Sequence, residues 1–282
     1  MEIGVGLPST VPATPGSLLL EWAERAEAGP YSSLGVLDRL RFDSYEPLSL
    51  LAAAAAVTSR IKLATMIVTS PLRTTALLAK EAATIDALSG GRLVLGVALG
   101  ARHDDYEAAG IDPAGRGALL TEQLLAFRAQ WENDRIGPRT ATDGGPTLLV
   151  GGSGDAAFQR VANHGDGYVH NGGPPRAFER AANGARAAWT EAGRPGLPLL
   201  WGQGYFALGD EAAERGREYM RGYYAFTGPF VEKIVAGTLT SAQDVVRLVQ
   251  GYEAAGCDEL VLFPAVSDPD QIDRLADALG SI

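Results

Sequence analysis

The segment TLLVGGSG at residues 147–154 has the composition of an anion-binding turn. Its apolar run would form a short strand, and a helical pattern begins directly after the last glycine. Gly151, Gly152 and Gly154 lack a Cβ, so their backbone could approach a ligand closely. Ser153 has the side chain of a helix N-cap, and the free amides of the helix behind it would attract a phosphate. The alternative is a plain strand-to-helix turn, because such motifs discriminate loosely.

Two histidines stand where apolar runs end, and either could move a proton. His103 follows the run VLGVALGAR and precedes Asp104 and Asp105, whereas His170 ends the run GYVH. Imidazole titrates near neutral pH, and a neighbouring carboxylate can fix its tautomer. We therefore predict that His103, oriented by one of these aspartates, is a proton donor, with His170 as the second candidate. The other interpretation of His103 is a solvent-facing loop residue.

Asp38 and Arg39 follow a third apolar run, SSLGVL. Both are candidates for catalysis, because a carboxylate can accept a proton and a guanidinium can bind an anionic group. Arg73 could pair with a substrate or cofactor in the same way. An arginine beside an aspartate is more often part of a structural ion pair, so that alternative stays open.

These candidates must be positioned by an alternation of short apolar runs and longer helical patterns. Strands are predicted at residues 3–7, 33–37, 61–68, 92–99, 147–150, 167–170, 199–208 and 259–263. Helices are predicted at 15–28, 45–58, 75–88, 117–131, 155–164, 175–192, 210–226, 241–255 and 269–279.

Strand-then-helix units without a break predict one domain over residues 1–282, an α/β fold of the (β/α)8 TIM-barrel type with an extended excursion after the seventh strand. Residues that follow each strand then meet at the mouth of the barrel. A doubly wound sheet is the alternative, but the first strand lacks the GxGxxG fingerprint.

Composition limits the class of protein. The net charge of −10 and the lack of a basic run argue against nucleic-acid binding. The longest apolar run, residues 48–57, is too short to span a bilayer, and we expect a cytoplasmic protein with no membrane partner. Cys257 and three histidines cannot form a structural zinc site, so no metal is expected.

Several longer motifs carry a family resemblance. They are SRIKLATMIVTSPLRTTALLAKEAATIDALSGGRLVLGVALG, DDYEAAGID, GPTLLVGGSG, HGDGY and GYEAAGCDELVLFP. Together they resemble the bacterial luciferase-like monooxygenase superfamily, whose members are flavin- and deazaflavin-dependent barrel oxidoreductases. The resemblance covers most of the chain between residues 36 and 279, and the segment 60–100 is its most specific part.

The resemblance implies a cofactor site at the barrel mouth. The ring of the cofactor would lie over the mouth, with its phosphate at Gly151 to Gly154. Thr65, Met66 and Ile67 would lie against the ring, where some members have a non-proline cis peptide. Gly100, after the fourth predicted strand, is assigned to the same site.

The chain also departs from the family pattern. Several relatives have a histidine after the second strand, where this sequence reads LDRLRFD, and some have a glutamate where we align Ala101. Their proton chemistry cannot be carried over directly. The candidates that remain are His103, His170 and Asp38.

Three functions stay open. The first is oxygenation of a small organic substrate with reduced FMN and O2, served by a separate flavin reductase. The second is hydride transfer with coenzyme F-420, which the lack of an obvious basic cluster after the strands disfavours, because that cofactor has a long anionic tail. The third is a non-catalytic flavin-binding barrel. Alanine-rich helices at 45–58 and 75–88 suggest a homodimer.

Overall fold

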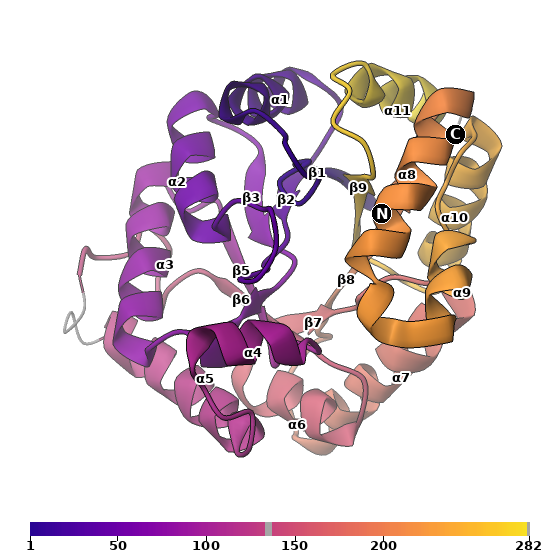
Figure 1. The fold of residues 1–282 in the computed structure, drawn as a ribbon. Helices are drawn as coiled ribbons and strands as arrows, with labels where there is room; N and C mark the ends of the chain where they lie inside the picture. The colour runs from indigo at the N-terminus through magenta and orange to yellow at the C-terminus, as the bar shows by residue number, and fades with distance from the viewer. Residues whose placement is uncertain (133–136, 281–282) are drawn as a thin grey trace.

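The protein is a closed parallel barrel surrounded by helices, seen along its axis in Figure 1. This computed structural model describes residues 1–132 and 137–280. The strands are β1 (Glu2–Gly6), β2 (Ser33–Val36), β3 (Lys62–Thr65), β4 (Val68–Thr69), β5 (Leu93–Ala98), β6 (Thr147–Gly151), β7 (Gly167–Val169), β8 (Leu199–Phe206) and β9 (Glu259–Pro264). They form one sheet in the order β3-β2-β1-β9-β8-β7-β6-β5-β4, and a further β3–β5 pairing closes it. The predicted TIM-barrel fold is confirmed.

One predicted strand is divided in two. The run at 61–68 forms β3 and β4, which both pair with β5 and so share one position in the barrel. Between them the Met66–Ile67 peptide bond is cis, at the place where the family resemblance implied such a bond. The amide of Met66 still donates to the carbonyl of Val36 at the end of β2, at 2.8 Å, and the ladder with β5 resumes at Val68.

Helices follow the strands and cover the outside of the barrel. They are α1 (Gly16–Ala28), α2 (Pro47–Val57), α3 (Thr75–Ser89), α4 (His103–Ala109), α5 (Arg116–Glu132), α6 (Asp155–His164), α7 (Pro175–Glu191), α8 (Asp210–Tyr223), α9 (Val231–Val235), α10 (Ala242–Ala254) and α11 (Gln271–Leu279), with 3-10 turns η1 (Ser70–Leu72) and η2 (Ala225–Phe230). The sequence interpretation missed the short helices α4 and α9 and extended the helix at 210–226 past the end of α8 into the start of η2. Short helices leave too few turns for a periodic pattern to be recognised.

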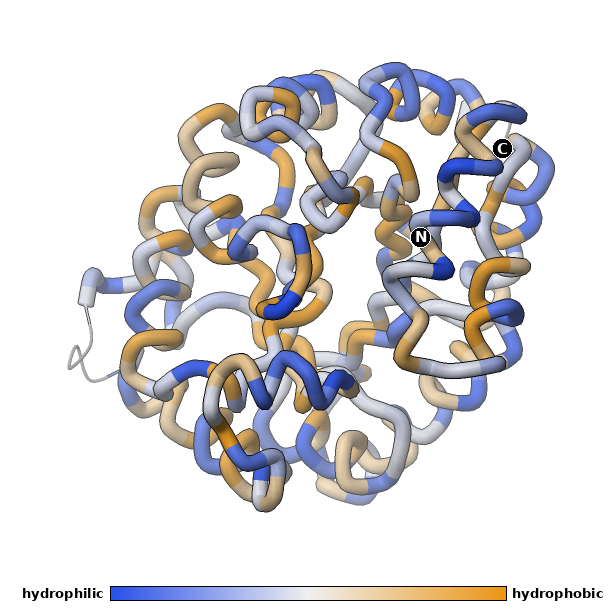
Figure 2. Tube along the Cα trace, in the orientation of Figure 1, coloured by the Kyte–Doolittle hydropathy of each residue, from blue (hydrophilic) through white to orange (hydrophobic). Residues whose placement is uncertain are grey.

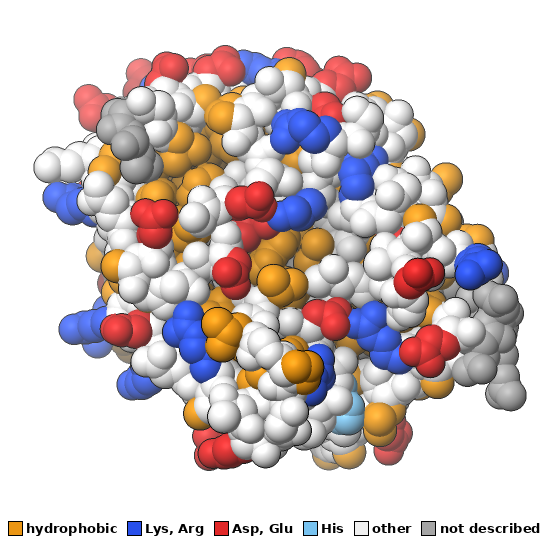
Figure 3. All heavy atoms as spheres, turned by 180° about the vertical axis from the view of Figure 1, so that it is seen from behind, with side chains coloured by type: hydrophobic (Ala, Val, Ile, Leu, Met, Phe, Trp, Pro, Cys, Tyr) orange, Lys and Arg blue, Asp and Glu red, His pale blue; other side chains and the backbone are white. Residues whose placement is uncertain are grey.

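Burial follows the two faces of the strands. Apolar side chains on the outer face pack under the helices, and a second cluster that includes Met66, Trp201 and Phe263 fills the barrel interior below its mouth. Figure 2 shows hydrophilic residues gathered on the outer helices around more hydrophobic central strands. On the face seen from behind in Figure 3, acidic and basic side chains are interspersed. No helix in the described ranges is long and apolar enough to cross a membrane.

Candidate active site

A cavity of about 610 Å³ opens at the carboxyl ends of the strands. It brings together most of the residues that the sequence singled out. Those that line it are Asp38, Met66, Ile67, Gly100, Gly151, Gly152, Ser153, Gly154 and His170. Thr65, Arg39 and His103 lie outside the lining. The catalytic and cofactor-binding roles of all these residues stay predictions.

The glycine-rich turn at Gly151 to Gly154 forms an open backbone surface at the start of α6. The predicted N-cap, Ser153, was wrong: Gly154 holds that position, and no side chain caps the helix. Gly154 accepts hydrogen bonds from the amides of the third and fourth residues after it. No side chain therefore competes with a ligand for the first amides of α6, and a phosphate is the group that such a helix end favours.

Gly152 and Gly154 lack a side chain for different structural reasons. Gly152 has a φ of +142°, and a Cβ there would lie 2.6 Å from Cβ of Ala157. Gly154 has extended backbone, and a Cβ there would have no atom within 4 Å. The fold itself thus requires glycine at 152, whereas at 154 the space that a side chain would fill belongs to the cavity.

The break between β3 and β4 exposes Met66 and Ile67 to the cavity. Thr65 is fully buried, and its hydroxyl donates to the carbonyl of Gly96 on β5 at 2.8 Å. This hydrogen bond fixes the end of β3 rather than presenting Thr65 to a ligand. Gly100 has a φ of +70° and lies against Thr69, so it shapes the same wall.

His170 follows β7 directly and lines the cavity, and its ring packs edge-on against Phe178 of α7. It is 7 % exposed, and its Nδ1 is buried without a hydrogen-bond partner among the described residues. Burial lowers the pKa of His170 to about 4. The imidazole is therefore neutral at pH 7, with one ring nitrogen able to donate and the other able to accept.

His103 does not have the environment that the sequence predicted. It is exposed at the first position of α4 and does not line the cavity. The expected pairing with Asp104 or Asp105 was wrong, because both carboxylates accept from Arg39 instead. The exposed position agrees with the alternative that we left open, a solvent-facing residue.

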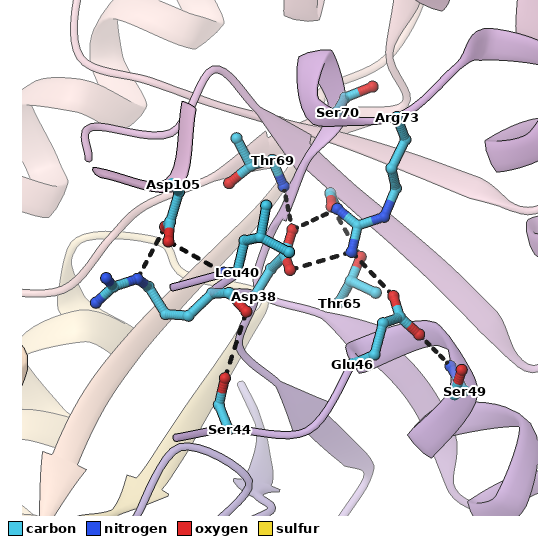
Figure 4. A network of polar contacts seen from close by, with 12 residues as sticks. Asp38, Leu40, Ser44, Glu46, Ser49, Thr65, Thr69, Ser70, Arg73 and Asp105 are labelled. Carbon is cyan, nitrogen blue, oxygen red and sulfur yellow. Dashed lines mark hydrogen bonds and ion pairs between the residues drawn. The ribbon is translucent and has the colours of Figure 1, made fainter. Parts of the chain in front are cut away.

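Asp38 lies at the cavity edge, but its carboxylate is already engaged. Arg73 donates to both of its oxygens, at 2.7 and 3.1 Å, and the backbone amide of Thr69 donates at 2.8 Å. Arg73 also donates to Glu46, which caps α2 through the amide of Ser49. Figure 4 shows this network joining the loop after β2 to β4 and α2. The geometry favours a structural ion pair for Asp38.

Arg39 points away from Asp38 and forms a separate buried ion pair. Its Nε donates to Asp105 at 2.8 Å, and each of these two side chains is 4 % exposed. The other oxygen of Asp105 accepts from the amides of Leu40 and Arg41. Arg39 therefore fastens the loop after β2 to α4, and its charge is not available to a ligand.

Three arginines that the sequence analysis did not assign to the site also line the cavity: Arg102, Arg116 and Arg160. None forms an ion pair within the described parts of the chain. Nε of Arg160 donates to Thr121 and one terminal nitrogen donates to the carbonyl of Gly117, so α5 and α6 hold Arg116 and Arg160 near each other. The expected lack of a basic cluster was wrong, because the three residues come from separate elements and only the fold brings them together.

The excursion after β8 supplies an aromatic wall. Tyr205, Tyr223, Tyr224 and Phe226 line the cavity, and the hydroxyls of Tyr205 and Tyr224 lie 2.8 Å apart. Burial raises the pKa of Tyr205 well above its usual value. The phenols are therefore uncharged, and this wall offers aromatic rings to a ligand.

A family model described as luciferase-like monooxygenase matches residues 1–255. The chain belongs to this family. It is 32 % identical over 206 residues to an uncharacterized protein of Mycobacterium tuberculosis, covering 61 % of this chain and 71 % of that protein. It is 30 % identical over 203 residues to pyrimidine monooxygenase RutA of Cronobacter sakazakii, covering 64 % of this chain and 58 % of RutA.

Solved structures agree with the luciferase-like fold. An F-420-dependent secondary alcohol dehydrogenase, in complex with an F-420-acetone adduct, superposes with a TM-score of 0.82 at 17 % identity. The match covers 99 % of this chain and 98 % of that chain. At this identity the likeness shows the fold alone. The members of the luciferase-like family to which the chain belongs are oxidoreductases or monooxygenases.

Proposed function

We propose that the protein is a luciferase-like monooxygenase that binds reduced FMN in this cavity and oxygenates a small organic substrate with O2. The observation that carries the proposal is the uncapped glycine turn at the start of α6, which lines the same cavity as Met66 and Ile67. The 30 % identity to a pyrimidine monooxygenase supports oxygenation.

The residues of the cavity fit a phosphorylated flavin. The amides of α6, with Arg116 and Arg160 beside them, would hold the phosphate, and Met66 and Ile67 would face the ring. When bound, the flavin supplies the redox chemistry with O2. The aromatic wall would exclude bulk water from the reaction.

His170 is the residue that we propose for proton transfer. It lines the cavity, and it is neutral at pH 7 because burial lowers its pKa to about 4. His103 is the comparison residue, because it is exposed outside the lining. A positioned general acid or base typically contributes about 10² to 10⁴ in rate. We expect His170→Ala to lower kcat by a factor in that range and His103→Ala to leave kcat nearly unchanged. The reverse result would favour His103 as the residue that transfers the proton.

A second candidate, hydride transfer with coenzyme F-420, is favoured by one observation. Arg102, Arg116 and Arg160 give the cavity three guanidinium groups without carboxylate partners in the described structure, which is more positive charge than one phosphate needs. A long anionic cofactor tail would use that charge.

One experiment separates these functions. The purified protein is titrated anaerobically with reduced FMN and with reduced F-420, and each complex is then exposed to O2. Tighter binding of reduced FMN, followed by O2 consumption, is the expected result. Tighter binding of F-420 with no reaction with O2 would favour the deazaflavin reductase, and binding of either cofactor without any turnover across a substrate panel would favour a non-catalytic barrel.

A further inference from the structure

Arg102 lies where the loop after β5 meets the excursion after β8. Its guanidinium carbon is 4.2 Å from the ring centres of both Tyr223 and Phe226, and 5.4 Å from that of Tyr224. One terminal nitrogen donates to the carbonyl of Tyr223 at 2.5 Å. The aromatic rings and this hydrogen bond therefore fix the plane of the guanidinium at the cavity wall.

Most of the hydrogen-bond donors of Arg102 have no protein partner. A guanidinium has five N–H groups, and the polar contacts that the described residues give it are the hydrogen bond to the carbonyl of Tyr223 and a contact with the phenol oxygen of the same residue. Two acidic residues of the cavity lining are occupied elsewhere, Asp38 by Arg73 and Asp105 by Arg39. The third, Asp155, begins α6 beside the glycine turn and forms no ion pair in the described structure. The positive charge of Arg102 is thus left without a counter-charge.

The space next to Arg102 is apolar apart from that charge. Tyr205 and Tyr224 direct their hydroxyls at each other, and Phe226 contributes a ring without polar atoms. A ligand here meets ring faces and one planar cation. Carboxylates match this arrangement, because their two oxygens pair with two N–H groups of a guanidinium at once.

We propose that the substrate is a small organic carboxylate, held by Arg102 through its carboxylate and by Tyr205, Tyr224 and Phe226 through its apolar part. This rests on the proposed function, since it names the substrate class of that reaction. Two anion sites then divide the cavity. The glycine turn with Arg116 and Arg160 takes the phosphate of the cofactor, and Arg102 takes the carboxylate of the substrate.

The test compares acids with their uncharged amides. Benzoate, benzamide, hexanoate and hexanamide are titrated into the purified chain by calorimetry, and FMN is titrated in parallel. We expect each carboxylate to bind about tenfold or more tightly than its amide, the range that hydrogen bonds to a charged group provide. Arg102→Gln should abolish this preference while amide and FMN binding stay within about twofold of the wild type.

Arg116→Gln is the matched control. It removes a second cavity arginine, whose side chain has no hydrogen bond to the protein in the described structure, so it should weaken FMN binding and leave the preference for benzoate over benzamide intact. Loss of that preference in Arg116→Gln but not in Arg102→Gln would overturn the assignment. So would equal binding of acids and amides by the wild type.

A second variant covers the case in which Arg102→Gln loosens the excursion. Arg102→Lys keeps the charge but not the planar pair of donors, and we expect an intermediate preference in a protein with wild-type melting behaviour. Benzoate binding equal to the wild type in this variant would contradict the bidentate contact. Failure of the proposed function looks different, because FMN would then fail to bind while the preference for carboxylates remained.

Discussion

The two sides of the cavity use charge in opposite ways. On the side of the loop after β2, Asp38 and Arg39 are engaged in short hydrogen bonds with Arg73 and Asp105. On the side of α6, the glycine turn leaves helix amides uncapped, and Arg116 has no acidic partner among the described residues. The first side holds loops and helices together, and the second has donors left for a ligand.

The difference shows that the position of a charged residue after a strand does not make it reactive. A carboxylate that already accepts three hydrogen bonds gains little binding free energy from a further bond to a substrate. An amide or guanidinium without an acceptor can form a new charge-assisted hydrogen bond with an anionic ligand. Ligand binding should therefore depend on the side of α6, and stability on the side of the loop after β2. Each of the following predictions tests this division.

The largest expected effect is on the structural side. Asp105→Ala removes the carboxylate that pairs with the buried Arg39, and we expect the free energy of unfolding to fall by about 3 to 5 kcal/mol, because an unpaired buried charge remains. Urea denaturation measures this change in the free energy of unfolding. The control is Asp104→Ala. The side chain of Asp104 is 42 % exposed, so its removal should lower the free energy of unfolding by less than about 1 kcal/mol. Equal effects of the two substitutions would mean that burial of the Arg39–Asp105 ion pair does not make it more important for stability than the exposed contact.

The next effect is a pH dependence of stability that His170 causes. Burial lowers its pKa from 6.5 to about 4 in the folded state, so the unfolded chain takes up a proton first as the pH falls. The stabilisation is complete above pH 6.5 and is lost as the pH drops towards 4, by up to about 3 kcal/mol. Subtracting the unfolding free energies of His170→Gln from those of the wild type between pH 7 and 4 isolates this residue. A flat difference would mean that the imidazole is not held neutral by burial.

The smallest expected effect concerns the glycine turn. Gly154→Val places a side chain in open cavity space. We expect FMN to bind about tenfold more weakly, while the free energy of unfolding changes by about 1 kcal/mol or less. Gly152→Ala is the contrast, because its Cβ would meet Ala157 and its φ is unfavourable, so stability should fall by about 1 to 3 kcal/mol. Fluorescence titration with FMN and thermal unfolding measure the pair. Unchanged FMN affinity in folded Gly154→Val would place the phosphate elsewhere.

Much of the fold followed from the sequence. Parallel strands buried on both faces give short continuous apolar runs, and helices that cover them give longer periodic ones, so the alternation was visible without coordinates. The strand before the glycine turn and the helix after it were recognised in the same way. His170 was found because it directly ends a strand, and strand ends meet at the barrel mouth.

Partners across the barrel were decided by the tertiary structure alone. Sequence adjacency suggested that Asp104 or Asp105 orients His103, yet both aspartates bind Arg39. Arg39 lies far away in the chain, after β2, and only β3 and β4 separate β2 from β5 in the barrel. The convergence of Arg102, Arg116 and Arg160 was hidden for the same reason. Periodicity reports which face of an element is buried, whereas the partner of a charged side chain depends on which elements the closed barrel places side by side.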